Sequence, residues 1–416
     1  MYNIQRLTSV SGSCPRRKWI GGICATLALS GCDRLRDLYT RASIPARGTI
    51  HALVWSNYFP QDLLNDFEAI TGIRVSVHTF STNDQLVDLL STRSFPYDLV
   101  MPSSYMLDRL RELDLLRPLR QAKMPNLKFV DRLGFPVRSD PYNQWIVPYI
   151  WGAVGLGYQA KATSVLPKSW AAFFKPPASR GKNPFNLSIL DDGRVALASA
   201  LLYAGVPPQN ASEKQIEEAG NLIIGIKDRI TYFESDNVAE LLAEDKVQLA
   251  MAWSGDVCKA MLGWPSPFST KESASEQSTD KSEGKFKRNI SVRLALPLEG
   301  TVLFQDSFAI PKLAAYQSEA EEFVNFLLSP ETAAKVTNFS LYANTITASR
   351  PDIHRFILSG PSYFRNPTGK SGNFAIELPA SIDTIYSRVW HRVKATISGP
   401  LPASPKLGTV IAPIKF

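Results

Sequence analysis

This chain of 416 residues has few histidines and cysteines, only four of each. The histidines show no paired spacing that would suit a metal site or a catalytic triad: His51, His78, His354 and His391. Two short glycine motifs also do not fit the nucleotide-binding loops that they resemble. Thr368–Ser371 lacks the glycine that a phosphate loop needs, because Phe364 stands there, and Pro167 interrupts the helix that should follow Gly155–Ala160 in a dinucleotide loop. We therefore predict no enzyme activity, cofactor or metal.

Acidic residues are absent from residues 1–31, which contain four basic residues. A basic start, a short apolar run at 19–29 and small residues at 30–31 are typical of a bacterial export signal. An uncleaved anchor or a mis-assigned start is the alternative. Removing this segment halves the net charge of +8. The remaining charge forms no basic run suited to nucleic acid, so we expect no nucleic-acid partner.

The end of this segment, Leu29-Ser30-Gly31-Cys32, resembles a lipobox, in which Cys32 is lipidated and becomes the new N-terminus. Asp33 resembles the signal that retains lipoproteins at the inner membrane. We thus expect signal peptide 1–31, a lipidated tether 32–47, and a periplasmic location anchored to the inner membrane, or the outer face of the cytoplasmic membrane. Only Cys258 then remains, which excludes an intramolecular disulfide and Cys-based metal sites. No second spanning-length apolar run follows.

From residue 49 the pattern alternates strands and helices. Strands are expected at 50–54, 73–77 and 97–101, and the helix between the first two has Leu63, Leu64, Phe67 and Ile70 on its apolar face, with Gly72 as its cap. Further strands are expected at 146–149, 155–158, 188–190 and 247–253, and helices at 85–90, 107–113, 194–203, 213–226 and 319–328. This order predicts an α/β protein with parallel, doubly wound sheets. Residues 265–289 are polar and read as an exposed, mobile insertion.

Aromatic and acidic side chains follow several strands. Trp55-Ser56-Asn57-Tyr58 follows the first strand, Ser103-Ser104-Tyr105 the third, and Trp253-Ser-Gly-Asp256 a later one. Ligands of open α/β sheets gather at the carboxyl ends of strands, so these clusters predict one crevice. The alternatives are packing for the aromatic rings and helix capping for Asp256 and for one of Asp191 and Asp192.

Asp306 lies between the apolar runs 302–304 and 308–310. Burying an unpaired carboxylate costs at least about 2–3 kcal/mol. Either an internal Arg or Lys pairs with Asp306, or the carboxylate binds a cationic ligand. Because tryptophan and tyrosine faces attract ammonium groups, the combination predicts a cleft for a linear organic cation.

These residues resemble the spermidine/putrescine-type solute-binding proteins of bacterial ABC importers. The similarity covers about residues 49–397 and is carried by the segments 55–58, 97–103, 147–152, 169–170, 253–256, 296–300, 306–311, 323–330 and 342–344. It implies the two-lobed, hinged α/β (type II) fold of periplasmic binding proteins and a membrane permease as partner. The lobes would comprise residues 48–151 with 303–345, and 152–302 with 346–400, followed by a tail at 401–416.

The resemblance also implies roles for single residues. An aromatic box around a methylene chain would consist of Trp55, Tyr105, Trp253, Phe304 and Tyr342. Ser56 and Ser103 would bond an amine, Asp256 and Asp306 would pair with ammonium groups, and Asn57 and Tyr58 complete the first cluster. The patterns at 253–256 and 342–344 are closer to putrescine than to spermidine receptors.

Two positions depart from the family pattern. Asn57 stands where the family has an acid after the first tryptophan, and Arg194-Val195 stands where it has a glutamate, for which Asp192 would have to compensate. A diamine or another amine thus remains a possible ligand. Further alternatives are another organic cation or a metal complex sensed at the surface, and an enzyme on the same fold with Cys258 as nucleophile.

Overall fold

The computed structural model describes residues 47–132, 137, 139–162, 167–175, 185–262, 291–360, 373–375 and 380–397. Two compact units divide the chain, Met1–Ala46 and Arg47–Phe416, and only the second is described below. The predicted export signal, Cys32 with nearly all of its tether, the insertion 265–289, the segment 368–371 and the tail 401–416 lie outside the described ranges.

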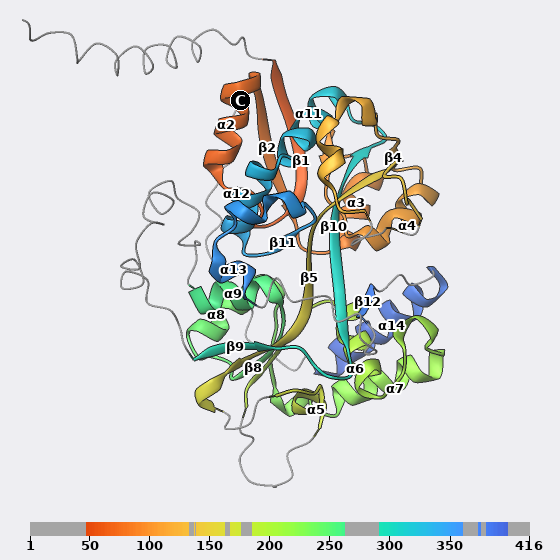
Figure 1. Cartoon of the computed structure of the whole chain (residues 1–416). Coiled ribbons are helices and arrows are strands. Elements are labelled where there is room, and N and C mark those ends of the chain that lie inside the picture. Colours follow the sequence, from red (N-terminus) through yellow and green to blue (C-terminus); the bar gives the residue numbers. More distant parts are fainter. Residues whose placement is uncertain are drawn as a thin grey trace, which may run out of the picture. The chain divides into compact units, whose positions relative to one another are not determined.

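The strands of the second unit form one mixed sheet (Figure 1). Its order is β2 (Ile73–Phe80), β1 (Gly48–Trp55), β3 (Leu99–Val100), β10 (Thr301–Pro311), β5 (Ile146–Gln159), β8 (Leu249–Trp253), β6 (Leu187–Ile189) and β7 (Ile230–Phe233). Short strands lie off this path: β4 (Leu116–Arg117) and β12 (Asn373–Ala375) pair with β10, and β9 (Val292–Ala295) and β11 (Ala343–Asn344) pair with β5.

The sheet is parallel towards its two ends and antiparallel in its middle. At one end β1 pairs in parallel with β2 and β3, and at the other β6 pairs in parallel with β7 and β8. In the middle, β10 is antiparallel to β3 and β5, and β5 is antiparallel to β8. The parallel pairing expected for the first three strands is therefore confirmed. The middle of the sheet differs, because two long antiparallel strands run there between the two parallel parts.

One group of helices belongs to the part of the molecule built around the parallel strands β1, β2 and β3. They are α2 (Gln61–Thr71), α3 (Asn83–Ser91), α4 (Leu107–Glu112), α11 (Gln317–Leu327), α12 (Pro330–Ser340) and α13 (Arg355–Leu358). Gly72 caps α2 in the left-handed conformation, with φ of 74°, as the sequence predicts. The predicted apolar face of α2 is right for Leu63, Leu64 and Phe67 but wrong for Ile70, which is 62% exposed because it lies beside the buried stripe.

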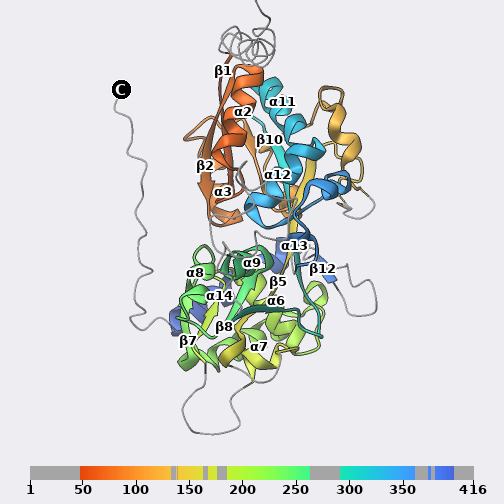
Figure 2. The same ribbon diagram turned by 60° about the vertical axis from the view of Figure 1, so that its left-hand side comes forward.

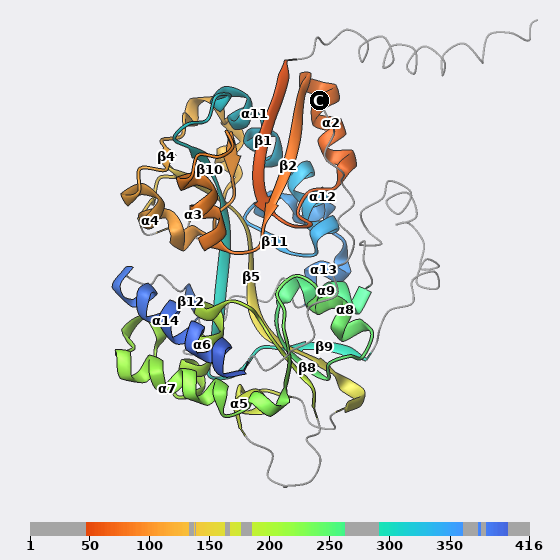
Figure 3. The same ribbon diagram turned by 180° about the vertical axis from the view of Figure 1, so that it is seen from behind.

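The second part is built around β6, β7 and β8. Its helices are α5 (Ala171–Phe174), α6 (Gly193–Tyr203), α7 (Glu213–Ile224), α8 (Val238–Ala243), α9 (Ser254–Leu262) and α14 (Ala380–Ile397). Figure 3 shows α14 lying against α6 and α7, and buried Val389 and Trp390 join the same apolar core as Leu197. Short 3₁₀ turns occupy Ser104–Met106, Gln121–Lys123, Pro125–Phe129, Ala160–Ala162, Pro208–Asn210, Lys227–Arg229 and Thr347–Asp352.

Strands β5 and β10 connect the two parts (Figures 1 and 2). All fourteen residues of β5 are buried, which removes the polar–apolar alternation that marks a surface strand. This explains why the sequence pattern indicates two short strands where the protein has one. The predicted lobe boundaries stay a prediction.

Candidate ligand-binding site

A pocket lies where the strand ends of both parts meet, and it encloses about 910 Å³ including its open mouth. Eleven of the twelve predicted ligand-binding residues line it: Trp55, Ser56, Tyr58, Ser103, Tyr105, Asp192, Trp253, Asp256, Phe304, Asp306 and Tyr342. Asn57 does not. It is exposed in a turn with φ of 60°, a conformation that asparagine tolerates better than most residues.

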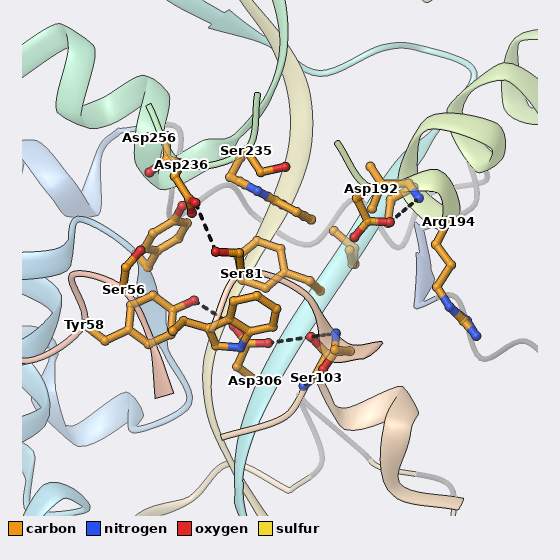
Figure 4. Close-up of a pocket in the computed structure, with 18 of the residues that line it drawn as sticks. Ser56, Tyr58, Ser81, Ser103, Asp192, Arg194, Ser235, Asp236, Asp256 and Asp306 are labelled. Carbon is orange, nitrogen blue, oxygen red and sulfur yellow. Dashed lines mark hydrogen bonds between the residues drawn. The ribbon is translucent and has the colours of Figure 1, made fainter. Parts of the chain in front are cut away.

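Asp306 is the most buried carboxylate of the pocket, with 2% of its surface exposed. Its strand has a bulge between Asp306 and Ser307, where the register against β5 shifts. The Tyr58 hydroxyl donates to Oδ2 at 2.7 Å, and the Ser103 hydroxyl donates to Oδ1 at 2.8 Å (Figure 4). Among the described residues, no lysine or arginine forms an ion pair with this carboxylate. Of the two alternatives for Asp306, the part of the chain that the structure describes thus offers no internal cationic partner.

Burial raises the pKa of Asp306 from its ordinary value of 3.8 to about 7, although the hydrogen bonds from Tyr58 and Ser103 lower it in part. Burial, followed by the charge of Asp306, raises the pKa of Tyr58 well above 10, so the phenol stays protonated as a donor. A cation placed beside Asp306 would favour the ionised carboxylate. A bound cation would thus stabilise the charged form of this side chain.

Asn83, in the first turn of α3, fixes Ser103. The amide Nδ2 of Asn83 donates to Ser103 Oγ at 3.1 Å and to the Tyr105 hydroxyl at 2.9 Å. Its Oδ1 accepts from the backbone N–H of Ser103 at 3.1 Å. Because Ser103 already receives one proton from Asn83, its own hydroxyl hydrogen is directed to Asp306.

Aromatic rings form the walls of the pocket. Phe304 packs edge-on against Trp253, with 5.0 Å between ring centres, and against Tyr342 at 5.7 Å. Two glycines make room for these rings. A Cβ on Gly255 would lie 2.4 Å from the Tyr342 ring, and one on Gly152 would lie 2.6 Å from the Phe304 ring. The glycine in Trp253-Ser-Gly-Asp256 is therefore required by packing.

Asp256 differs from Asp306 because it has a cationic partner within the protein. It is 5% exposed, and the ammonium of Lys259, one helical turn on, lies 2.7 Å from its Oδ1. Helix α9 begins at Ser254, so the alternative that Asp256 caps a helix starting at Val257 is wrong. Lys259 was not predicted from the sequence, although its i,i+3 spacing to Asp256 was a signal for it.

Asp192 has two roles in the structure. It caps α6 by accepting the backbone N–H of Val195 at 3.1 Å, so the prediction of a capping role for one of this acidic pair is confirmed. It also lines the pocket, and burial raises its pKa. Asp191 instead pairs with Lys394 of α14 at 3.0 Å.

Several lining residues were not predicted from the sequence: Ser81, Asn83, Arg194, Val195, Ser235, Asp236, Lys259, Val302 and Leu303. Some of them join the two sides of the pocket. The Ser81 hydroxyl donates to Asp236 at 3.3 Å, and the Arg194 guanidinium stacks over the Tyr105 ring at 4.3 Å. Ser81, Ser235 and Asp236 lie in turns without a regular pattern, so no sequence signal pointed to them.

Cys258 is not among the lining residues. It is 3% exposed and packs with Leu262, Ala334 and Leu341 in a small apolar cluster between α9 and α12. A nucleophile must reach its substrate, so this position does not favour the alternative of a Cys258-dependent enzyme.

The comparisons with known proteins agree with this geometry. A family model described as bacterial extracellular solute-binding protein matches residues 62–355. The chain belongs to this family. The fold is accordingly the predicted two-lobed α/β (type II) fold of periplasmic binding proteins. Within the described residues, no helix is both long and apolar enough to cross a membrane.

Relatives of this solute-binding protein include the putrescine-binding periplasmic protein PotF of Escherichia coli K12. It is 28% identical over 389 residues, which cover 91% of this chain and 98% of PotF. A putrescine/agmatine-binding protein of Pseudomonas aeruginosa PAO1 is 25% identical over 381 residues, covering 89% and 98%. The TpPotD lipoprotein of Treponema pallidum has a similar solved structure, with a TM-score of 0.66 at 22% identity over 83% of this chain and 99% of that one.

Proposed function

We propose that this protein is the substrate-binding component of a polyamine ABC importer, which binds putrescine or a related linear amine in the pocket and delivers it to a membrane permease. The observation that carries the proposal is Asp306, a carboxylate that is 2% exposed, opens to the pocket and has hydroxyl donors but no cation among the described residues. A buried carboxylate of this kind is stabilised by a bound cation.

The rest of the pocket supports an amine with an apolar chain. The rings of Trp55, Trp253, Phe304 and Tyr342 offer faces to methylene groups and to an ammonium group. Putrescine is the first candidate because the names of several relatives include it, PotF among them. The proposed ammonium anchor is Asp306, with Tyr58 and Ser103 orienting its oxygens.

The proposal includes lipid attachment at Cys32 and a periplasmic position at the inner membrane. It is supported by the export-signal pattern of residues 1–31 and by the lipobox-like Leu29–Cys32. Expression in a bacterium fed a labelled fatty acid tests this part. Wild-type protein should carry the label and sediment with membranes, whereas Cys32→Ser should carry none; an unlabelled wild-type protein would refute lipidation.

The ligand is tested by calorimetric titration of the full chain, purified in detergent, with putrescine, cadaverine, spermidine and an amino acid of similar length. We expect saturable binding of at least one amine and none of an ordinary α-amino acid. Absence of saturable binding of every amine, or equal binding of all four compounds, would refute the proposed function.

A further inference from the structure

Lys259 is a cationic side chain inside a pocket that we propose binds cations. It lines the pocket from α9 and is 8% exposed. Its ammonium lies 2.7 Å from Asp256 Oδ1 and 5.3 Å from the centre of the Tyr342 ring. A carboxylate and an aromatic face are the two partners that an ammonium group of a ligand would need.

The two buried carboxylates of the pocket therefore differ in what they can offer. Asp306, on β10, has neutral donors, while Asp256, on α9, is already neutralised by a lysine of its own helix. Breaking a buried ion pair by withdrawing one partner is strongly unfavourable. A second ammonium group of the ligand that bound at Asp256 would have to displace Lys259 and leave that lysine without this carboxylate.

One further positive side chain in the pocket acts in the same direction. Arg194 also lines the pocket and stacks over Tyr105, so it adds a second positive charge to a cavity that already contains Lys259. Like charges in a site of low polarity repel. Lys259 and Arg194 thus offset part of the negative charge that the four lining aspartates carry when ionised.

We propose that Lys259 acts as a tethered ammonium group that fills the subsite at Asp256, and that it makes the receptor select linear amines with a single ammonium end. This inference rests on the proposed function, because it assumes that Asp306 binds one ammonium group. The preferred class is a linear primary amine with an uncharged polar group at its other end, such as a mono-N-acylated diamine, and a free diamine binds less well.

The test measures the ratio of the binding constants for putrescine and N-acetylputrescine, which share one chain but differ by one charge. Calorimetry would be run on the full chain for wild type and Lys259→Met, which keeps most of the side-chain length. We expect wild type to favour N-acetylputrescine. Lys259→Met should shift the ratio towards putrescine by about tenfold or more, because Asp256 becomes available.

The double variant Asp256→Asn/Lys259→Met guards against loss of folding in the single variant, because it removes the ion pair as a unit. Its ratio should lie closer to that of wild type than to that of Lys259→Met. A ratio that does not change in Lys259→Met, or a double variant that loses putrescine selectively, would overturn the inference and leave the proposed function standing. Absence of any amine binding to wild type would instead refute the proposed function.

Discussion

Tyr58 donates a hydrogen bond to Asp306 with 2.7 Å between the two oxygens, across 248 residues of sequence. Both residues are buried, at 6% and 2% exposed. The bond joins the turn after the first strand to the long strand β10, so folding of the first part of the molecule builds the carboxylate site. Because the donor is neutral, the carboxylate is oriented without being neutralised.

Asp306→Asn should stabilise the unliganded protein at neutral to alkaline pH. The pKa of Asp306 is raised from 3.8 to about 7 in the folded state, so the stability cost of ionising it builds up between these values and is fully present above pH 7. Removing the charge should increase the free energy of unfolding by about 1–3 kcal/mol at pH 8. Urea denaturation measures this, with the exposed Asp228→Asn as control, which should change stability by less than about 0.5 kcal/mol. A lower free energy of unfolding for Asp306→Asn than for wild type would contradict the conclusion that the ionised Asp306 side chain destabilises the unliganded protein.

Amine affinity should depend on pH through the same group. Below about pH 7 the unliganded carboxyl is protonated, and it must release a proton before it can pair with an ammonium group. The binding constant should fall by about tenfold per pH unit below 7, until the pKa of the complex is reached, and level off above it. Calorimetry from pH 5.5 to 8.5, in buffers of different ionisation enthalpy, measures the affinity and the proton release. A flat profile would refute this linkage.

Gly255→Ala should weaken both folding and ligand binding, although alanine is the better helix former. The new Cβ would lie 2.4 Å from the Tyr342 ring and push it into the pocket. We expect a loss of about 1–3 kcal/mol of stability, as for other overpacked cores. Gly225→Ala is the control, because that glycine has φ of −62° and only carbonyl oxygens at 3.3 Å nearby. Equal effects of both changes would contradict the packing argument.

Two histidines lie in contact in the structure, although their spacing in the sequence suits neither a metal site nor a catalytic triad. His51 on β1 and His78 on β2 lie 3.2 Å apart through Nδ1 and Nε2, and burial, then His51, lower the pKa of His78. As the pH falls, His78 is therefore protonated in the unfolded chain before it is protonated in the folded protein. The free energy of unfolding should decrease as the pH falls through about 6.5. Because Asp306 has the opposite effect, the test compares the change in unfolding free energy between pH 8 and 5.5 in wild type and His78→Gln. We expect His78→Gln to lose less unfolding free energy between pH 8 and 5.5 than wild type. An equal loss in both proteins would refute the role of His78.

Local patterns were sufficient to predict much of the fold. The apolar spacing and Gly72 predicted α2, and helices near 194–203 and 213–226 correspond to α6 and α7. The single strand β5 was not predictable from alternation, because every residue in it is buried. The antiparallel pairing of β10 with β3 depends on contacts between segments about 200 residues apart, which no local pattern encodes.

The pocket was predicted to a similar degree. Of the eleven lining residues, seven belong to clusters at strand ends, which converge in an open α/β sheet. Asp306 was identified by the apolar runs around it, and Phe304, Tyr342 and Asp192 by the resemblance to a known family. Asn57 was included because it lies in the first cluster and at a position where the family has an acid, but it is exposed and has a left-handed backbone. Asn83 was missed because its partner Ser103 lies 20 residues further along the chain and comes close only on folding. Lys259 was missed although its i,i+3 spacing to Asp256 is visible in the sequence.

Calorimetric titration of putrescine into wild type and Asp306→Asn at pH 8 tests the central claim most directly. Asp228→Asn, which lies outside the pocket, serves as the control. If Asp306 is the ammonium anchor, wild type and Asp228→Asn bind saturably, and Asp306→Asn loses about a hundredfold or more in affinity, as expected for a buried charge pair. Binding of equal strength to Asp306→Asn and wild type would contradict the account.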